Sequence, residues 1–173
     1  MNMTKASPRK RIWAWVLTAA LAVSLAVPLL TPAARAAEEY DTAGATSFVF
    51  SNSGITAAEG GYSGYKIDGT ALTIQAAGVY SVSGSCADGS IKVKKGVTGV
   101  TLILSGLTLT SADTAPITCA KSTGVTIAAA AGTVNTLTDS AKNNDETYPN
   151  NENAENAVIK CKDGSQVTIC GTG

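Results

Sequence analysis

Lysines recur at matching positions of two related segments, where together they could bind a polyanion. Lys92 and Lys94 alternate with apolar residues in one segment, and Lys160 and Lys162 hold the aligned positions of the other. Alternate residues of a strand point to the same side of a sheet, so all four side chains are predicted on one outer face. Gathered in this way, they would attract an anionic chain such as a polyuronate. The alternative is a solvated face whose lysines only keep the protein soluble.

Oxygen-bearing side chains crowd a polar insertion at residues 139–156 and could bind calcium. Asp139, Asp145 and Glu146 are the candidate ligands, and several asparagines lie among them. Calcium takes about six to eight oxygen ligands, which flexible loops can supply. The spacing differs from that of an EF-hand loop. The alternative is a polar loop without any ion.

Aromatic side chains could add contacts to sugar rings. Tyr148 lies in an Asn-rich loop and is the first candidate, and Tyr62 and Tyr65 lie in a Gly-rich stretch. Alternation with polar residues instead assigns Phe48 and Phe50 to the core.

An internal repeat supplies the elements that must position these residues. Residues 89–106, 115–132 and 156–173 each contain a strand, a turn and a second strand, and the last two superpose without a gap. Stacking these units would pile like side chains on like. The predicted ladders are Ile91–Ile117–Ile159, Val93–Cys119–Cys161, Val100–Val125–Val167 and Leu102–Ile127–Ile169.

The repeat predicts an all-β fold, specifically a right-handed parallel β-helix (β-solenoid). Ile91 and Ile117 are 26 residues apart, which suits one coil, and successive coils would lie about 4.8 Å apart. Each coil is predicted to hold three short strands, with Gly106 separating the second from the third. A β-sandwich is the alternative. Because the sequence stops at Gly173 in mid-coil, we expect a truncated solenoid that needs missing C-terminal coils or a capping partner.

The N-terminal segment has a different character. Residues 1–36 combine a basic start, an apolar run and the small-residue pattern Ala34-Arg35-Ala36, which together are typical of a cleaved secretory signal peptide. An uncleaved membrane anchor is the alternative. The protein is therefore expected to be secreted, extracellular or on the cell surface, with no membrane contact after cleavage. Residues 37–47 are a predicted linker, and residues 48–173 form the predicted solenoid domain.

Removal of the signal peptide changes the composition. Thirteen acidic and eight basic residues remain, which gives a net charge of −5, and Trp, Arg and His are all absent. Nucleic-acid binding is disfavoured because it depends on a dense cationic surface. Catalysis by a serine or cysteine nucleophile with a histidine base is excluded. The four cysteines of an exported chain could form disulfides, and Cys119 and Cys161 would pair across one rung or pack as thiols.

Two motifs carry a resemblance to a known family. GTALTIQAAGVYSVSG at residues 69–84 and NTLTD at residues 135–139 resemble the secreted carbohydrate-binding β-helix family of cellulolytic clostridia, and the likeness covers residues 48–173. The resemblance implies a fold like that of polysaccharide lyases. It also implies binding of cellulose, of acidic polysaccharides such as polygalacturonate, and of calcium. Asp139 is the first candidate ligand, because the end of a strand would hold it in place.

The sequence thus predicts a non-catalytic, calcium-assisted extracellular module that binds a plant cell-wall polysaccharide, either cellulose or an acidic one. A polysaccharide lyase of the pectate type is one alternative, although its base in this fold is usually an arginine, which the chain lacks after residue 36. A structural or adhesive surface repeat is the second alternative.

Overall fold

The computed structural model describes Tyr40, residues 42–58 and residues 63–173. The larger sheet contains β1 (Thr46–Ser51), β2 (Gly54–Ala57), β5 (Gly78–Cys86), β7 (Val100–Thr110), β9 (Gly124–Ala129), β10 (Thr136–Thr138) and β12 (Gln166–Gly171). The smaller sheet contains β3 (Tyr65–Asp68), β4 (Ala71–Ile74), β6 (Ser90–Val93), β8 (Ile117–Cys119) and β11 (Ile159–Cys161). A short 3₁₀ helix, η1, spans Ala141–Asn143.

The predicted signal peptide at residues 1–36 lies outside the described residues. In the part of the chain that the structure describes, no helix is long and apolar enough to cross a membrane.

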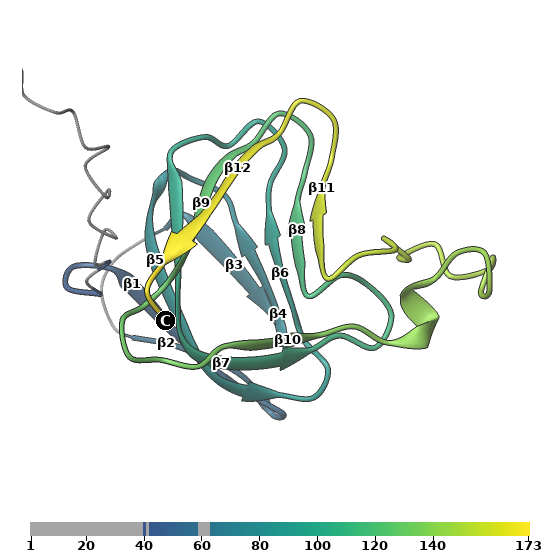
Figure 1. Ribbon diagram of the computed structural model, residues 1–173, viewed down its shortest axis with the longest axis horizontal. Coiled ribbons are helices and arrows are strands. Elements are labelled where there is room, and N and C mark those ends of the chain that lie inside the picture. Colours follow the sequence, from purple (N-terminus) through teal and green to yellow (C-terminus); the bar gives the residue numbers. More distant parts are fainter. Residues whose placement is uncertain (1–39, 41, 59–62) are drawn as a thin grey trace, which may run out of the picture. The chain divides into compact units, whose positions relative to one another are not determined.

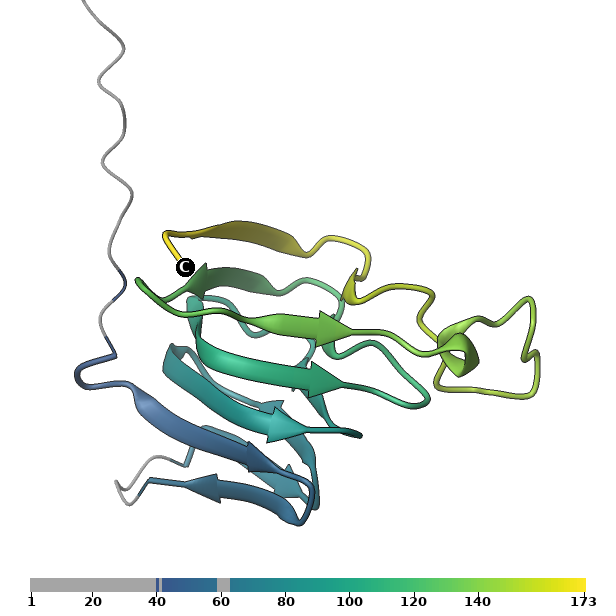
Figure 2. The ribbon, with the colours of Figure 1, turned by 60° about the horizontal axis from the view of Figure 1, so that its bottom comes forward.

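The all-β class is confirmed, and both sheets are mixed. The larger sheet has the order β12-β9-β7-β5-β1-β2 with β10 beside β7, and the smaller has the order β11-β8-β6-β4-β3. Most neighbours pair in parallel, whereas β1–β2 and β3–β4 are antiparallel. The strands rise in sequence order from β1 and β2 (blue) to β12 (yellow), as Figures 1 and 2 show.

The predicted ladders are confirmed in register. Ile91–Ile117–Ile159 and Val93–Cys119–Cys161 pair across the smaller sheet, and Val100–Val125–Val167 and Leu102–Ile127–Ile169 pair across the larger one. The first two members of every ladder are buried. The last rung is more open, and Ile169 is 68% exposed. Parallel stacking of like side chains therefore builds one core.

The prediction of three separate strands per coil is confirmed for residues 117–138, which form β8, β9 and β10, and was wrong for residues 71–110. Residues 107–109 continue β7 instead of forming their own strand, and β5 likewise runs unbroken through Gly84. Gly84 and Gly106 both have positive φ, +93° and +79°. Glycine adopts this conformation without a steric penalty, and the register between β5 and β7 shifts here, so β7 continues past Gly106, where a break was expected.

The predictions for the aromatic residues are confirmed in part. Phe48 and Phe50 are in the core, as predicted, and β1 begins at Thr46, inside the predicted linker. The expectation for Tyr65 was wrong, because it starts β3 and packs edge-on against Phe48 with ring centroids 4.8 Å apart. Tyr62 lies outside the described residues.

The polar insertion, residues 139–156, forms an arm that projects beside β11 and carries η1 (Figure 1). Asn143 at its base is 1% exposed. The Nδ2 of Asn143 donates to Asp139 (2.8 Å) and to the carbonyl of Ala157 (3.0 Å). Farther out, Asn151 donates to the carbonyl of Asp113 (2.8 Å), in the loop between β7 and β8. These bonds tie the arm to the stack at two places.

Candidate functional site

Lysines stand on alternate rungs of the outer face of the smaller sheet. Paired residues form one row across the strands of this sheet. Its order is Lys66, Thr73, Lys92, Thr118 and Lys160, so that each threonine lies between two lysines. Neighbouring strands lie about 4.8 Å apart, so lysines separated by one threonine lie about 10 Å apart. This lysine face (Lys66, Lys92 and Lys160) is a regular row of lysines, of which Lys66 is paired with Asp68 at 3.3 Å.

The other two predicted lysines follow the ends of β6 and β11. Lys94 is exposed. The Nζ of Lys162 lies 2.6 Å from the Oε1 of Glu155, with side-chain exposures of 35% and 17%. The predicted set is thus brought to one sheet, but Lys162 is already neutralised by a carboxylate of the arm.

A second ion pair lies at the adjoining turns. Lys121 and Asp163 approach to 2.9 Å, and both are solvent-exposed. The hydrogen bond and charge of Lys121 lower the pKa of Asp163, and those of Asp163 raise the pKa of Lys121. Lys121 is therefore bound to Asp163, although it could otherwise add positive charge to the lysine face.

A groove of about 320 Å³ separates the arm from the smaller sheet. One wall comes from the sheet, with Lys92 and Thr118, and the other comes from the arm, with Glu152 and Glu155. Thr118 belongs to the outward-pointing row, yet it is only 5% exposed. We call this space the arm groove. It brings lysines, a hydroxyl and two carboxylates together.

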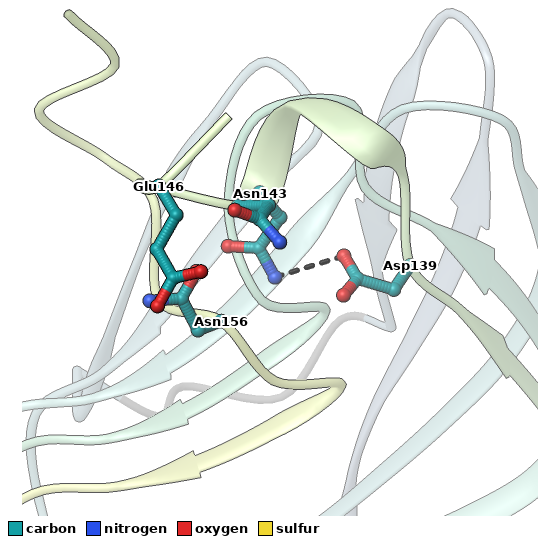
Figure 3. Close-up of a pocket in the computed structure, with 5 residues that line it drawn as sticks. Asp139, Asn143, Glu146 and Asn156 are labelled. Atoms are coloured by element: carbon teal, nitrogen blue, oxygen red, sulfur yellow. Dashed lines mark hydrogen bonds between the residues drawn. The ribbon is translucent and has the colours of Figure 1, made fainter. Parts of the chain in front are cut away.

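The candidate calcium ligands are only partly brought together. A cavity of about 290 Å³ is lined by Asp139, Asn143, Asn144, Glu146 and Asn156. The Oδ1 of Asp139 accepts hydrogen bonds from the backbone N–H of Ser140 and the Nδ2 of Asn143, both at 2.8 Å. Figure 3 shows Asn143 between Asp139 and Glu146, which lies beside Asn156.

Asp145 is absent from the lining of that cavity and instead accepts a hydrogen bond from the Nδ2 of Asn156 at 2.6 Å. The amide oxygens of Asn143 and Asn156 accept from backbone N–H groups. Within the described ranges, no three His, Cys, Asp or Glu side chains lie close enough to hold a metal. The oxygen chemistry suits calcium, but the two cavity carboxylates fall short of about six to eight ligands, so water would complete the shell.

Tyr148 lies on another side of the arm and is 40% exposed. It lines a cavity of about 360 Å³ with Asp113, Lys142 and Asn150. Its backbone N–H donates to the carbonyl of Asn144 at 2.8 Å, which holds the main chain of Tyr148 beside the cavity. This geometry offers an aromatic surface beside a carboxylate and an ammonium group.

Sequence reasoning missed Asp113 and Asn156 as lining residues. Asp113 lies in a loop 35 positions from Tyr148, and no repeat relates the two. Asn156 takes a positive φ of 56°, which closes the arm back toward β11. Neither placement has a signal in residue spacing.

The cysteine rung is present as predicted. Cys119 and Cys161 pair in register, and all four cysteines are free thiols. Cys119 is fully buried and Cys161 is exposed. Burial, together with the neighbouring Cys161, raises the pKa of Cys119 to about 12. The inner thiol therefore packs as a small apolar group.

Comparison with known proteins identifies the family. A family model described as carbohydrate-binding domain-containing protein matches residues 68–173, more than half of the chain. The chain belongs to this carbohydrate-binding domain family. The matched segment includes the lysines from Lys92 onward, the arm groove, the Asp139 cavity and Tyr148. Neither a curated protein nor a solved structure matches the chain.

Proposed function

We propose that this member of the carbohydrate-binding domain family is a non-catalytic extracellular module that holds an acidic plant cell-wall polysaccharide along the lysine face. The observation that carries the proposal is the pairing of Lys92, Thr118 and Lys160 in consecutive strands. A polyuronate repeats its carboxylates along its length, and a row of ammonium groups about 10 Å apart can contact several of them. Each contact is weak, and the row gains strength by multivalency.

We infer that the two mixed sheets are walls of a right-handed parallel β-helix. The continuous ladders, such as Leu102–Ile127–Ile169, support this inference, since each coil repeats the side chains of the one before. A β-helix would let the lysine row run parallel to the stacking axis. The ligand would then lie across the strands.

We further propose a weak, water-rich calcium site at Asp139 and Glu146. Both carboxylates line one cavity, and that of Glu146 accepts no hydrogen bond from the described residues. Bound calcium would offset the repulsion between the arm and an acidic glycan. Asp139→Asn should abolish any calcium-dependent rise in melting temperature, whereas Asp145→Asn should retain it, as differential scanning fluorimetry can measure.

The central test is binding to polygalacturonate in pull-down and calorimetry. The Lys92→Gln/Lys160→Gln variant should bind about tenfold more weakly at low salt, since each exposed charge contact contributes up to about 1 kcal/mol. Lys95→Gln/Lys121→Gln removes the same charge at the turns and should bind much like the wild type. Raising the ionic strength to 1 M should weaken wild-type binding strongly.

Unchanged binding by Lys92→Gln/Lys160→Gln would refute the lysine face. The lyase alternative is checked in the same samples, because cleavage of the eliminative type generates unsaturated, ultraviolet-absorbing ends. A calcium-dependent rise in that absorbance would refute the non-catalytic assignment. Parallel runs with and without EDTA, and on cellulose, define the ion dependence and the glycan.

A further inference from the structure

The arm groove already contains a carboxylate bound to a lysine. Glu155 and Lys162 meet at 2.6 Å at the wall of the groove, and Glu152 lines the same space. Lys92 forms the opposite wall and takes part in none of the ion pairs among the described residues. The groove therefore holds one engaged lysine and one without a salt bridge.

The surroundings of this pair suit an acidic sugar. The hydroxyl-bearing residues Ser90, Thr114 and Thr118 line the groove together with the two lysines. A uronate unit offers one carboxylate to an ammonium group and several hydroxyls to neighbouring polar side chains. In the folded protein, the carboxylate of Glu155 takes the place that such a group would need on Lys162.

We propose that the arm groove is a carboxylate-binding subsite for an acidic glycan and that Glu155 is its tethered occupant, which the glycan displaces from Lys162. The inference rests on the proposed function, because it assumes that the glycan lies on the smaller sheet. It adds the position of one ligand carboxylate. It also identifies Glu155 as a residue that sets affinity and selectivity for charged sugars.

The local geometry permits displacement without unfolding the arm. The backbone N–H of Glu155 donates to the Oδ1 of Asn143 at 2.6 Å, which holds the main chain independently of the side chain. Lys162 retains 35% of its side-chain exposure, so solvent and ligand can reach the pair. Rotation of the Glu155 side chain is therefore sufficient to release Lys162.

The expected effect follows from the strength of such a pair. A partly exposed ion pair shifts the equilibrium toward the Glu155–Lys162 contact, and away from a free Lys162, by up to about fivefold. Neutralising Glu155 also removes its repulsion from an incoming carboxylate. Glu155→Gln should thus bind polygalacturonate about three- to tenfold more tightly than the wild type in low salt.

The experiment measures binding of full-length wild type and variants to polygalacturonate and to its methyl-esterified form by calorimetry, in EDTA. Glu155→Gln should gain affinity for the free acid and none for the ester. Asp145→Asn is the matched control, because it removes one charge from the same arm outside the groove. Glu155→Gln/Lys162→Gln should lose the gain, since the released lysine is then missing.

Equal or weaker binding by Glu155→Gln would overturn the inference, as would an equal gain in Asp145→Asn or with the ester. Glu152→Gln provides a second measurement, because it leaves the Glu155–Lys162 ion pair intact. It should give a smaller gain in affinity, since it only reduces the repulsion of the incoming carboxylate. If neither glutamate variant gains affinity, the subsite is refuted. Lys92 belongs to both surfaces, so failure of the lysine face is judged by Lys160→Gln, which leaves both groove lysines in place, and failure of the subsite by the glutamate variants, which keep Lys92 and Lys160. Thermal denaturation checks that every variant is folded.

Discussion

The stacking of like residues predicts that identical substitutions in one ladder have unequal costs. Ile127 and Ile169 are paired in register, but Ile127 is 2% exposed and Ile169 is 68% exposed. Ile127→Ala removes three buried carbons, about 2.4 kcal/mol of transfer free energy, and leaves a cavity that adds about 1 kcal/mol. Ile169→Ala loses about one third of the transfer free energy, roughly 0.8 kcal/mol, and leaves no enclosed cavity. The difference in unfolding free energy should be about 2.5 kcal/mol.

Urea unfolding followed by far-ultraviolet circular dichroism measures both costs directly. The slope of free energy against urea should be the same in both variants, so that midpoints report stability alone. A loss near 3 kcal/mol for Ile169→Ala would refute the reasoning, because it would mean that the last rung is covered in solution. A loss below about 1 kcal/mol for Ile127→Ala would refute the stacked core itself.

Three further predictions concern single residues. Because burial raises the pKa of Cys119 to about 12, folding favours its protonated thiol; that stability is present below the ordinary pKa of 9.0 and is lost as the pH rises toward 12. At pH 8 a thiol reagent should therefore label exposed Cys161 and spare Cys119, as mass spectrometry can show. Gly84→Ala should destabilise the fold by roughly 2–4 kcal/mol, since the added carbon would overlap the backbone of β1, whereas Gly96→Ala meets no atom and should cost about 1–2 kcal/mol in thermal or urea unfolding. Asn135 accepts two backbone N–H bonds of β7, both at 2.9 Å, so Asn135→Ala should cost about 1–3 kcal/mol and Asn135→Asp much less.

The core could be predicted from the sequence because stacking repeats its own environment. Once Ile117 was aligned with Ile159 and Cys119 with Cys161, the parallel register followed, and the structure has that register. Like residues in neighbouring repeat units have the same neighbours, so selection for packing leaves a visible pattern. The same logic placed Lys92 and Lys160 on one face.

The strand boundaries were harder to predict because a glycine can either end a strand or lie within one. Gly96 and Gly99 interrupt the chain between β6 and β7, as predicted. Gly84 and Gly106 have similar positive φ values, yet β5 and β7 continue through them. The outcome depends on whether the neighbouring strand still offers pairing partners beyond the glycine, and the sequence of one coil does not contain that information.

The positions of the lysines could be predicted from the repeat, whereas the contacts made by the arm could not. The arm has no counterpart in the other repeat units, so no alignment places Glu155 against Lys162 or Asn151 against Asp113. These contacts arise from the path that the arm takes over the sheet. The three predicted calcium ligands are only partly brought together for the same reason, since Asp145 pairs with Asn156 and lies outside the cavity of Asp139 and Glu146.

The division between repeat and arm bears on how selective the binding can be. A lysine is a flexible, strongly hydrated point charge, so the row formed by Lys92 and Lys160 can adapt to many anionic chains. The arm groove is different, because Thr118 is nearly buried there and the backbone of Glu155 is fixed by Asn143. Fixed groups discriminate between ligands better than mobile ones, since less conformational freedom is lost on binding. We therefore expect the lysine row to supply most of the salt-dependent affinity and the arm groove to distinguish a free carboxylate from its ester. Lys160→Gln leaves both groove lysines in place, so loss of affinity in this variant with the preference for the free acid retained would separate these two roles.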